Sequence, residues 1–377
     1  MGIYLDYAST TRMSQRAQSE YLRVANSYIG NPQGNHRFSR EALAELDNAR
    51  ERVAVALGVS PSEIYFTGSA TEANNIALNL EGKILTSAIE HKAVLAPAMA
   101  RKANIFSVTS DGTIDRDLLR QLLKESGEEL KLVSFMAVNN EIGVVNPVVI
   151  LGGMVKKYTS ALFHCDAVQA ANYFDLRAMV VNCDTLSLSA HKFGGPKGVG
   201  ILYIREGVKV KPLMLGGAQE RDIRPGTTNL AGAVSASVAF EDASRSTDNS
   251  YLAVQKLRDQ FEDGVLASDN RIFATIDRNA PRSPAISNLL FPGTVNEEML
   301  FLLDSMGVAA SGGAACASGA LDPSHVILAL GYEPKMARSA LRFSFSTTTT
   351  AAEVDEAIEI VLHAYRKLVP IGSGVES

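Results

Sequence analysis

The sequence is poor in the residues that build disulfide frameworks and metal centres. Cys165, Cys183 and Cys316 are its three cysteines in 377 residues, and no two of them have CxxC spacing. Disulfide-rich domains and structural zinc sites both require paired cysteines or several closely spaced ligands. We therefore expect neither a disulfide framework nor a metal site, and this usage fits a reducing cytosol.

The sequence also lacks the features of membrane-bound, secreted and nucleic-acid-binding proteins. Its apolar runs are strand-sized, too short for a membrane span. Residues 1–7 show no basic segment followed by an apolar one, as a secretory signal would. Asp6 occupies the position where myristoylation requires Ser or Thr. The net charge is -5 and no long basic run is present. We expect a cytoplasmic protein without a membrane span or direct nucleic-acid contact.

What the sequence does contain is an alternation of short apolar runs and helical patterns. The expected strands cover residues 64–66, 84–86, 132–137, 162–164, 185–189 and 201–204. The expected helices cover 39–57, 71–80, 91–101, 115–125 and 149–159. Such alternation predicts an α/β fold with a mostly parallel sheet covered by helices on both faces, and ligands bind at the carboxyl ends of its strands.

The pattern changes after a polar stretch at residues 244–250. Beyond it we expect helices at 251–267, 296–306 and 351–367 and strands at 286–291 and 341–345. This is typical of a smaller α+β domain. The predicted division is a large domain at 12–249, and a small domain made of 1–11 with 250–377.

Lys192 follows the expected strand 185–189, within the sequence Ser-Ala-His-Lys and before a turn rich in glycine. A lysine in a dry pocket at a strand end can act as a nucleophile or form a Schiff base. Ser189 and His191 beside it can donate hydrogen bonds to a phosphate. A solvated surface lysine is the alternative, since most lysines are exposed.

Two further strand ends carry polar groups. Residues 67–75 form a turn of small residues between a strand and a helix. Such a turn can bind an anion such as phosphate. The alternative is an ordinary helix start capped by Ser69 or Thr71. Asp166 ends the strand near 162–164 and would need a positive partner such as a protonated pyridine, unless it caps a helix. Cys165 should point to the opposite face as a buried core thiol.

Residues 311–320 are all small except for Cys316 at the centre. A segment with so little side-chain packing should be mobile, and a mobile arm with one thiol can collect a group and deliver it elsewhere. A tightly packed turn with an incidental cysteine is the alternative.

Together these stretches resemble the cysteine desulfurases, the NifS/IscS-like branch of the class V aminotransferase superfamily. The resemblance runs from Tyr4-Leu5-Asp6-Tyr7-Ala8 to Arg342-Phe343-Ser344. It includes Gly30-Asn31-Pro32, Glu90-His91-Lys92, Asn139-Asn140-Glu141-Ile142-Gly143, Ser189-Ala190-His191-Lys192, Arg224-Pro225-Gly226-Thr227 and the segment around Cys316. It implies the fold type I architecture of enzymes that use pyridoxal 5′-phosphate (PLP).

The resemblance also implies the site residues. Lys192 matches the lysine that binds PLP, His91 the imidazole that stacks on its ring, and Asp166 the partner of its pyridine nitrogen. Gln169 and Asn140 match groups near the phenolic oxygen, and Asn140 is also close to the substrate carboxylate. The phosphate cradle matches Ala70, Thr71, Ser189 and His191, and Ala190 is a further cofactor-binding position. Arg342 matches the clamp on the substrate carboxylate, and Asn31 a second substrate contact.

Thr227 matches a residue that reaches the phosphate of the other subunit, so the resemblance implies a homodimer with shared sites. The implied reaction converts L-cysteine to L-alanine and leaves the sulfur on Cys316 as a persulfide, for transfer to an acceptor protein. A selenocysteine lyase or a class V aminotransferase of the same fold is the alternative. The acceptor stays open, since iron–sulfur cluster assembly, tRNA thiolation and sulfur modification of DNA all draw on this chemistry.

Overall fold

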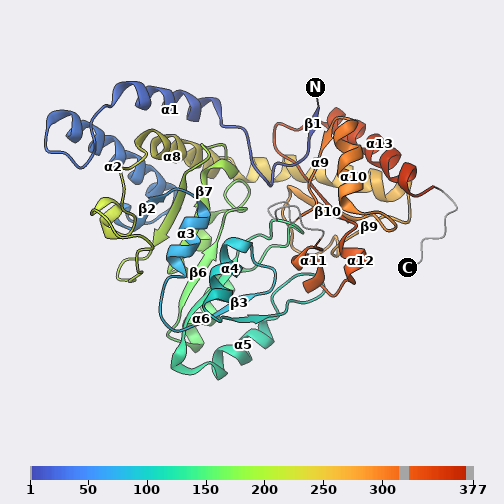
Figure 1. Cartoon of the computed structure of the whole chain (residues 1–377), viewed down its shortest axis with the longest axis horizontal. Coiled ribbons are helices and arrows are strands. Elements are labelled where there is room, and N and C mark those ends of the chain that lie inside the picture. The colour runs from blue at the N-terminus through green and yellow to red at the C-terminus, as the bar shows by residue number, and fades with distance from the viewer. Residues whose placement is uncertain (1, 314–321, 371–377) are drawn as a thin grey trace.

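The computed structural model describes residues 2–313 and 322–370, so Cys316 lies outside the described residues. Figure 1 shows an α/β body that contains the central sheet and, beside it, a smaller part formed mainly by the C-terminal third of the chain. Among the described helices, none is long and apolar enough to cross a membrane.

The α/β body is built on a sheet that has seven strands within the described residues. Their order is β2 (Ile64–Thr67), β8 (Gly200–Ile204), β7 (Thr185–Ser189), β6 (Leu162–Asp166), β5 (Leu130–Met136), β3 (Lys83–Ser87) and β4 (Asn104–Phe106). The strands from β7 to β4 are parallel, whereas β8 runs antiparallel to both of its neighbours. The carboxyl ends of β5, β6 and β7 therefore meet at one edge.

Helices cover both faces of this sheet, as the apolar runs of the strands predicted (Figure 1). One face packs against α3 (Ala70–Ala77) and α4 (Lys92–Ala100) through residues such as Ile84 and Leu132. The other face packs against a larger group of helices through residues such as Phe135 and Phe163. That group comprises α1 (Gln15–Ser27), α2 (Arg37–Leu57), α5 (Arg116–Glu125), α6 (Val148–Tyr158), α7 (Leu176–Val180) and α8 (Leu230–Arg245).

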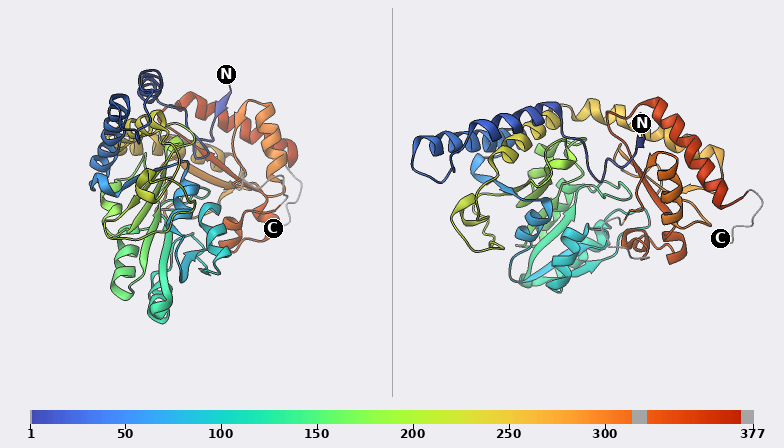
Figure 2. Two further views of the ribbon diagram at one scale, coloured as in Figure 1. Left: turned by 60° about the vertical axis from the view of Figure 1, so that its left-hand side comes forward. Right: turned by 45° about the horizontal axis from the view of Figure 1, so that its top comes forward.

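The smaller part has its own apolar core around Phe261, Phe343 and Tyr365. Its antiparallel sheet has the order β12 (Ala340–Ser344), β10 (Ile286–Leu290) and β9 (Phe273–Ala274). The N-terminal β1 (Ile3–Tyr4) joins it by pairing in parallel with β11 (Val308–Ala309). Its helices are α9 (Thr247–Ser268), α10 (Asn296–Ser305), α11 (His325–Ala329), α12 (Pro334–Ala337) and α13 (Ala351–Leu368). Figure 2 shows β1 beside α13, so both ends of the described chain belong to this part.

The predicted α/β class and fold type I architecture are confirmed, with boundaries that shift by a few residues. Helix α3 ends at Ala77 rather than near 80, and the polar stretch at 244–250 is the junction of α8 and α9 around Ser246. Cys165 is fully buried, as expected. The division into 12–249 and 1–11 with 250–377 remains a proposal, which the separate apolar cores support.

Candidate active site

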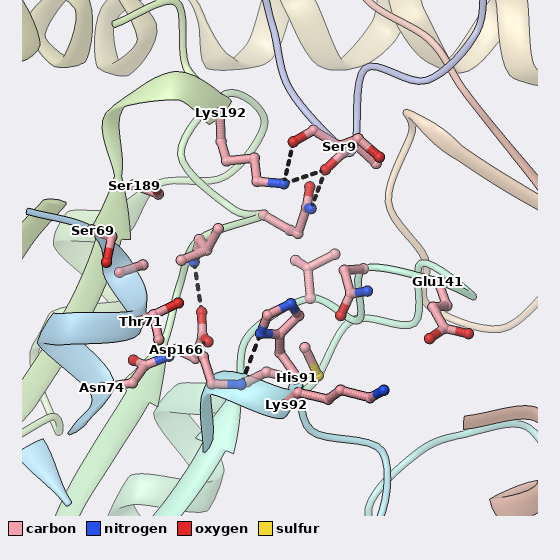
Figure 3. Close-up of a pocket in the computed structure, with 18 of the residues that line it drawn as sticks. Ser9, Ser69, Thr71, Asn74, His91, Lys92, Glu141, Asp166, Ser189 and Lys192 are labelled. Carbon is pink, nitrogen blue, oxygen red and sulfur yellow. Dashed lines mark hydrogen bonds between the residues drawn. The ribbon is translucent and has the colours of Figure 1, made fainter. Parts of the chain in front are cut away.

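A cavity of about 280 Å³ lies at the carboxyl ends of the central strands, where the α/β body meets the smaller part. Figure 3 shows Lys192 on one side of this cavity and Asp166, His91 and Thr71 on the other. Most of the predicted site residues line it: Ala70, Thr71, His91, Asn140, Asp166, Gln169, Ser189, His191, Lys192 and Arg342. Residues from six segments of the sequence therefore converge on one space.

Lys192 ends a short 3₁₀ turn, Ala190–Lys192, that directly follows β7. Its Nζ donates hydrogen bonds to the backbone oxygens of Ala8 at 2.5 Å and Ser9 at 2.8 Å. The Gln169 amide donates to the same Ala8 oxygen at 2.8 Å. The segment after β1 thus crosses from the smaller part and orients the amine at the cavity wall.

Asp166 is the last residue of β6, and its side chain is almost completely buried. One carboxylate oxygen accepts a hydrogen bond from the Asn74 amide at 2.7 Å, and the other accepts from the backbone N–H of Val168 at 3.1 Å. No helix begins at Asp166 within the described residues, so a turn, not a helix cap, follows the strand. The carboxylate is held in place and faces the cavity (Figure 3).

The turn before α3 has the form of an anion site. Ser69 caps the helix, since its side chain accepts from the backbone N–H of Glu72 at 3.1 Å, as one reading of the sequence predicted. Thr71 and Ser189 lie near Ser69 at the same end of the cavity (Figure 3), and His191 also lines the cavity. A Cβ at Gly200 would overlap the backbone of Ser69, so glycine there lets β8 approach the turn closely.

Burial lowers the pKa values of two imidazoles at the cavity, those of His91 and His191. The His91 Nδ1 accepts from the backbone N–H of Ala93 at 3.0 Å and caps α4, and burial lowers the pKa of His91. Burial, followed by the nearby charges of Lys192 and Lys197, lowers the pKa of His191 to about 4. A neutral ring can offer an N–H to a phosphate or accept a proton from a substrate.

Arg342 approaches the cavity from β12 of the smaller part. Its guanidinium donates to the backbone oxygen of Asn140 at 2.7 Å, to Asp6 Oδ1 at 2.8 Å and to Ser9 Oγ at 2.7 Å. It is 3% exposed, and its Nε has no hydrogen-bond partner among the described residues. A planar guanidinium that lines a cavity is suited to a ligand carboxylate.

A second group of charged side chains lies at the other end of the cavity. It consists of Lys92 and Glu141 (Figure 3), and His325 and Gly313 also line the cavity. The Glu141 carboxylate accepts from Ser324 Oγ at 2.5 Å, and burial raises the pKa of Glu141. Gly313 precedes Cys316 by three residues in the sequence, and the backbone of Ser311 pairs with that of Arg342.

Three of the predicted residues do not line this cavity. Ala190 is fully buried beneath it, whereas Asn31 and Thr227 are exposed. Sequence reasoning in turn gave no role to Ala8, Ser9 or Asn74. Asn74 could have been found, because it follows Ala70 by four residues and so shares its face of α3. The contact of Ser9 with Lys192 joins residues 183 positions apart and left no local pattern.

Comparisons with known proteins agree with this geometry. Residues 3–357 match the family model described as "Aminotransferase class-V". The chain belongs to the class-V aminotransferase family. PLP is the cofactor of the cysteine desulfurases of this family.

Individual relatives are also similar over nearly their full length. The protein named "Cysteine desulfurase IscS" of Dictyoglomus turgidum is 36% identical over 97% of this chain and 95% of its own length. A solved structure described as "NIFS-LIKE PROTEIN" is 34% identical with a TM-score of 0.88, covering 96% of this chain and 99% of its own. One described as "SspA in complex with cysteine" is 29% identical with a TM-score of 0.76, covering 92% and 99%.

Proposed function

We propose that this class-V family member is a PLP-dependent cysteine desulfurase that transfers sulfur from L-cysteine to Cys316. The observation that carries the proposal is the convergence of the Lys192 amine, the Asp166 carboxylate and the Arg342 guanidinium on one cavity, with Gly313 at its edge. The relatives named as cysteine desulfurases, and the neighbour described in complex with cysteine, support it.

The residues present fit PLP at each chemically distinct part. Lys192 would hold the aldehyde carbon, Asp166 the pyridine nitrogen, and the turn at Ala70 and Thr71, with Ser189 and His191, the phosphate. Two observations of the chain support this assignment: a buried carboxylate needs a cationic partner, and a capped helix start offers free N–H groups to an anion. PLP, when bound, supplies an electron sink for the α-carbon of an amino acid.

The chain's own groups account for the remaining steps. Arg342 would bind the substrate carboxylate, since its planar guanidinium lines the cavity. The Lys192 amine would take the proton from the substrate α-carbon, and His91 would accept the proton of a thiol. The Cys316 thiolate would attack the substrate sulfur, breaking its bond to the β-carbon and forming a persulfide, so that L-alanine leaves.

Cys316→Ser tests this proposal directly. We expect the variant to bind PLP and L-cysteine as the unmodified protein does, but to form neither alanine nor a protein persulfide detectable by mass spectrometry. Cys183→Ser is the matched control, because Cys183 is buried away from the cavity. Normal alanine production by Cys316→Ser would reject the role of this thiol, and consumption of a keto acid would indicate an aminotransferase instead.

We further infer a homodimer with shared sites. Thr227 is exposed and lines no part of its own cavity. Arg224 in the same motif forms an ion pair at 2.9 Å with Glu72 in the first turn of α3. Apolar side chains are exposed nearby in sequence, with Leu215 94% exposed. A second copy that covers this loop would bring Thr227 to the partner's phosphate. Delivery of sulfur to an acceptor, as in iron–sulfur cluster assembly, and a cytoplasmic location remain predictions.

A further inference from the structure

The carboxylate of Asp166 is held by the side chain of Asn74, which no sequence pattern identified. Asn74, on α3, is 1% exposed and donates from Nδ2 to Asp166 Oδ2 at 2.7 Å. Its Oδ1 lies 3.1 Å from Nε2 of His164. The amide therefore joins Asp166 to a buried imidazole.

His164 occupies β6 two residues before Asp166, so both side chains point to the same face of the strand. It is fully buried and does not line the cavity. Its Nδ1 lies 2.8 Å from Oγ1 of Thr185, the residue directly opposite on β7. Four side chains from three elements thus form a continuous row: Thr185, His164, Asn74 and Asp166.

The chemistry of the groups fixes the direction of these hydrogen bonds. A carboxylate only accepts, so the Asn74 NH₂ must face Asp166 and its carbonyl oxygen must face His164. His164 Nε2 must then carry a proton to donate, which leaves Nδ1 to accept from the Thr185 hydroxyl. Burial lowers the pKa of His164 to about 3, which agrees with a neutral ring. In each hydrogen bond of the row, the donor is the group farther from Asp166.

We propose that Asn74 and His164 are positioning residues, which hold the Asp166 carboxylate in the orientation that binds the pyridine nitrogen of PLP. The proposal rests on the proposed function for the identity of that ligand. His164 acts only through Asn74, because it does not reach the cavity itself. Adjacent links in such a row polarise one another, so a change at the far end is felt at Asp166.

The experiment compares four variants in their affinity for PLP, measured by absorbance titration of the apoprotein. Asn74→Ala removes a hydrogen bond to the charged Asp166, and we expect it to weaken PLP binding about 10-fold or more. His164→Leu removes a hydrogen bond between neutral groups, and we expect it to weaken PLP binding about fivefold. We also expect a shifted absorbance maximum of bound PLP. His164→Gln keeps an N–H where Nε2 lies and should restore affinity to within about threefold.

Asn75→Ala is the matched control. Asn75 is the next residue on α3, donates to the backbone oxygen of Thr71 at 2.9 Å and does not line the cavity. We expect its PLP affinity and spectrum to be unchanged. Asn74→Ala with normal affinity and spectrum, or His164→Leu and His164→Gln with equal affinities, would overturn the positioning role.

A measurement on the unmodified chain covers the case in which the variants do not fold. Nitrogen NMR of ¹⁵N-histidine-labelled apoprotein should show His164 neutral with its proton on Nε2 at neutral pH. A proton on Nδ1, or a charged ring, would overturn the row regardless of PLP. Failure of the unmodified protein to bind PLP, with the expected tautomer present, would refute the proposed function and leave the row intact.

Discussion

Arg342→Lys is the change that most sharply tests how the chain binds its substrate. The substitution keeps the positive charge but replaces a planar fork with one nitrogen. Arg342 donates to Asn140, Asp6 and Ser9 and still has Nε without a partner among the described residues. A lysine ammonium cannot keep these three bonds and also present two parallel donors to a substrate carboxylate.

The magnitude follows from the bonds that are lost. A hydrogen bond to a charged group contributes about 1.5–3 kcal/mol, which corresponds to roughly 10- to 100-fold in kcat/KM. Most of the change should appear as a raised KM, because the carboxylate is bound alike in the ground state and the transition state. The assay is the initial rate of alanine formation over a range of L-cysteine concentrations.

Arg338→Lys provides the control for this measurement. Arg338 is exposed and lies two residues before β12, outside the cavity. We expect its kcat and KM to match those of the unmodified protein. If Arg342→Lys also keeps its KM while its PLP content is normal, Arg342 does not bind the substrate carboxylate.

The remaining predictions concern pH and assembly. Burial raises the pKa of Glu90 from 4.5 to about 8, so between these pH values the folded chain keeps a proton that the unfolded chain loses. The free energy of unfolding should therefore fall as the pH rises from 4.5 to about 8. In Glu90→Gln, the free energy of unfolding measured by urea denaturation should depend less on pH. An equal pH dependence in the variant and the unmodified protein would contradict this prediction. Sedimentation velocity should show a dimer, and Thr227→Ala should weaken PLP binding although Thr227 is exposed in one chain. A monomer, or an unchanged affinity, would refute the shared site.

Buried strands were predictable because both faces of the sheet are covered, which makes the strands continuous apolar runs. Helix α8 was not predictable in the same way, because it is surrounded by neighbours on nearly all sides through small residues and shows no clear helical period. The antiparallel direction of β8 likewise has no local pattern, since it depends on the connection rather than on the strand itself.

Candidate site residues were predictable where several polar groups follow one strand, as at Ser189, His191 and Lys192. Residues that reach the site from a distant segment were not. Ala8 and Ser9 contact Lys192 only because β1 pairs with β11 in the smaller part. Asn74 contributes through a bond to a residue 92 positions away, and that proximity is created by the packing of α3 on the sheet.

The central claim is that the amine of Lys192 holds PLP, and peptide mapping tests it most directly. Lys92 also lines the cavity, so the chain offers a second candidate amine in the same space. After borohydride reduction of the PLP-loaded protein and proteolysis, mass spectrometry should find the phosphopyridoxyl group on the peptide that contains Lys192. The label on Lys92 instead, or on no lysine of the cavity, would contradict the account.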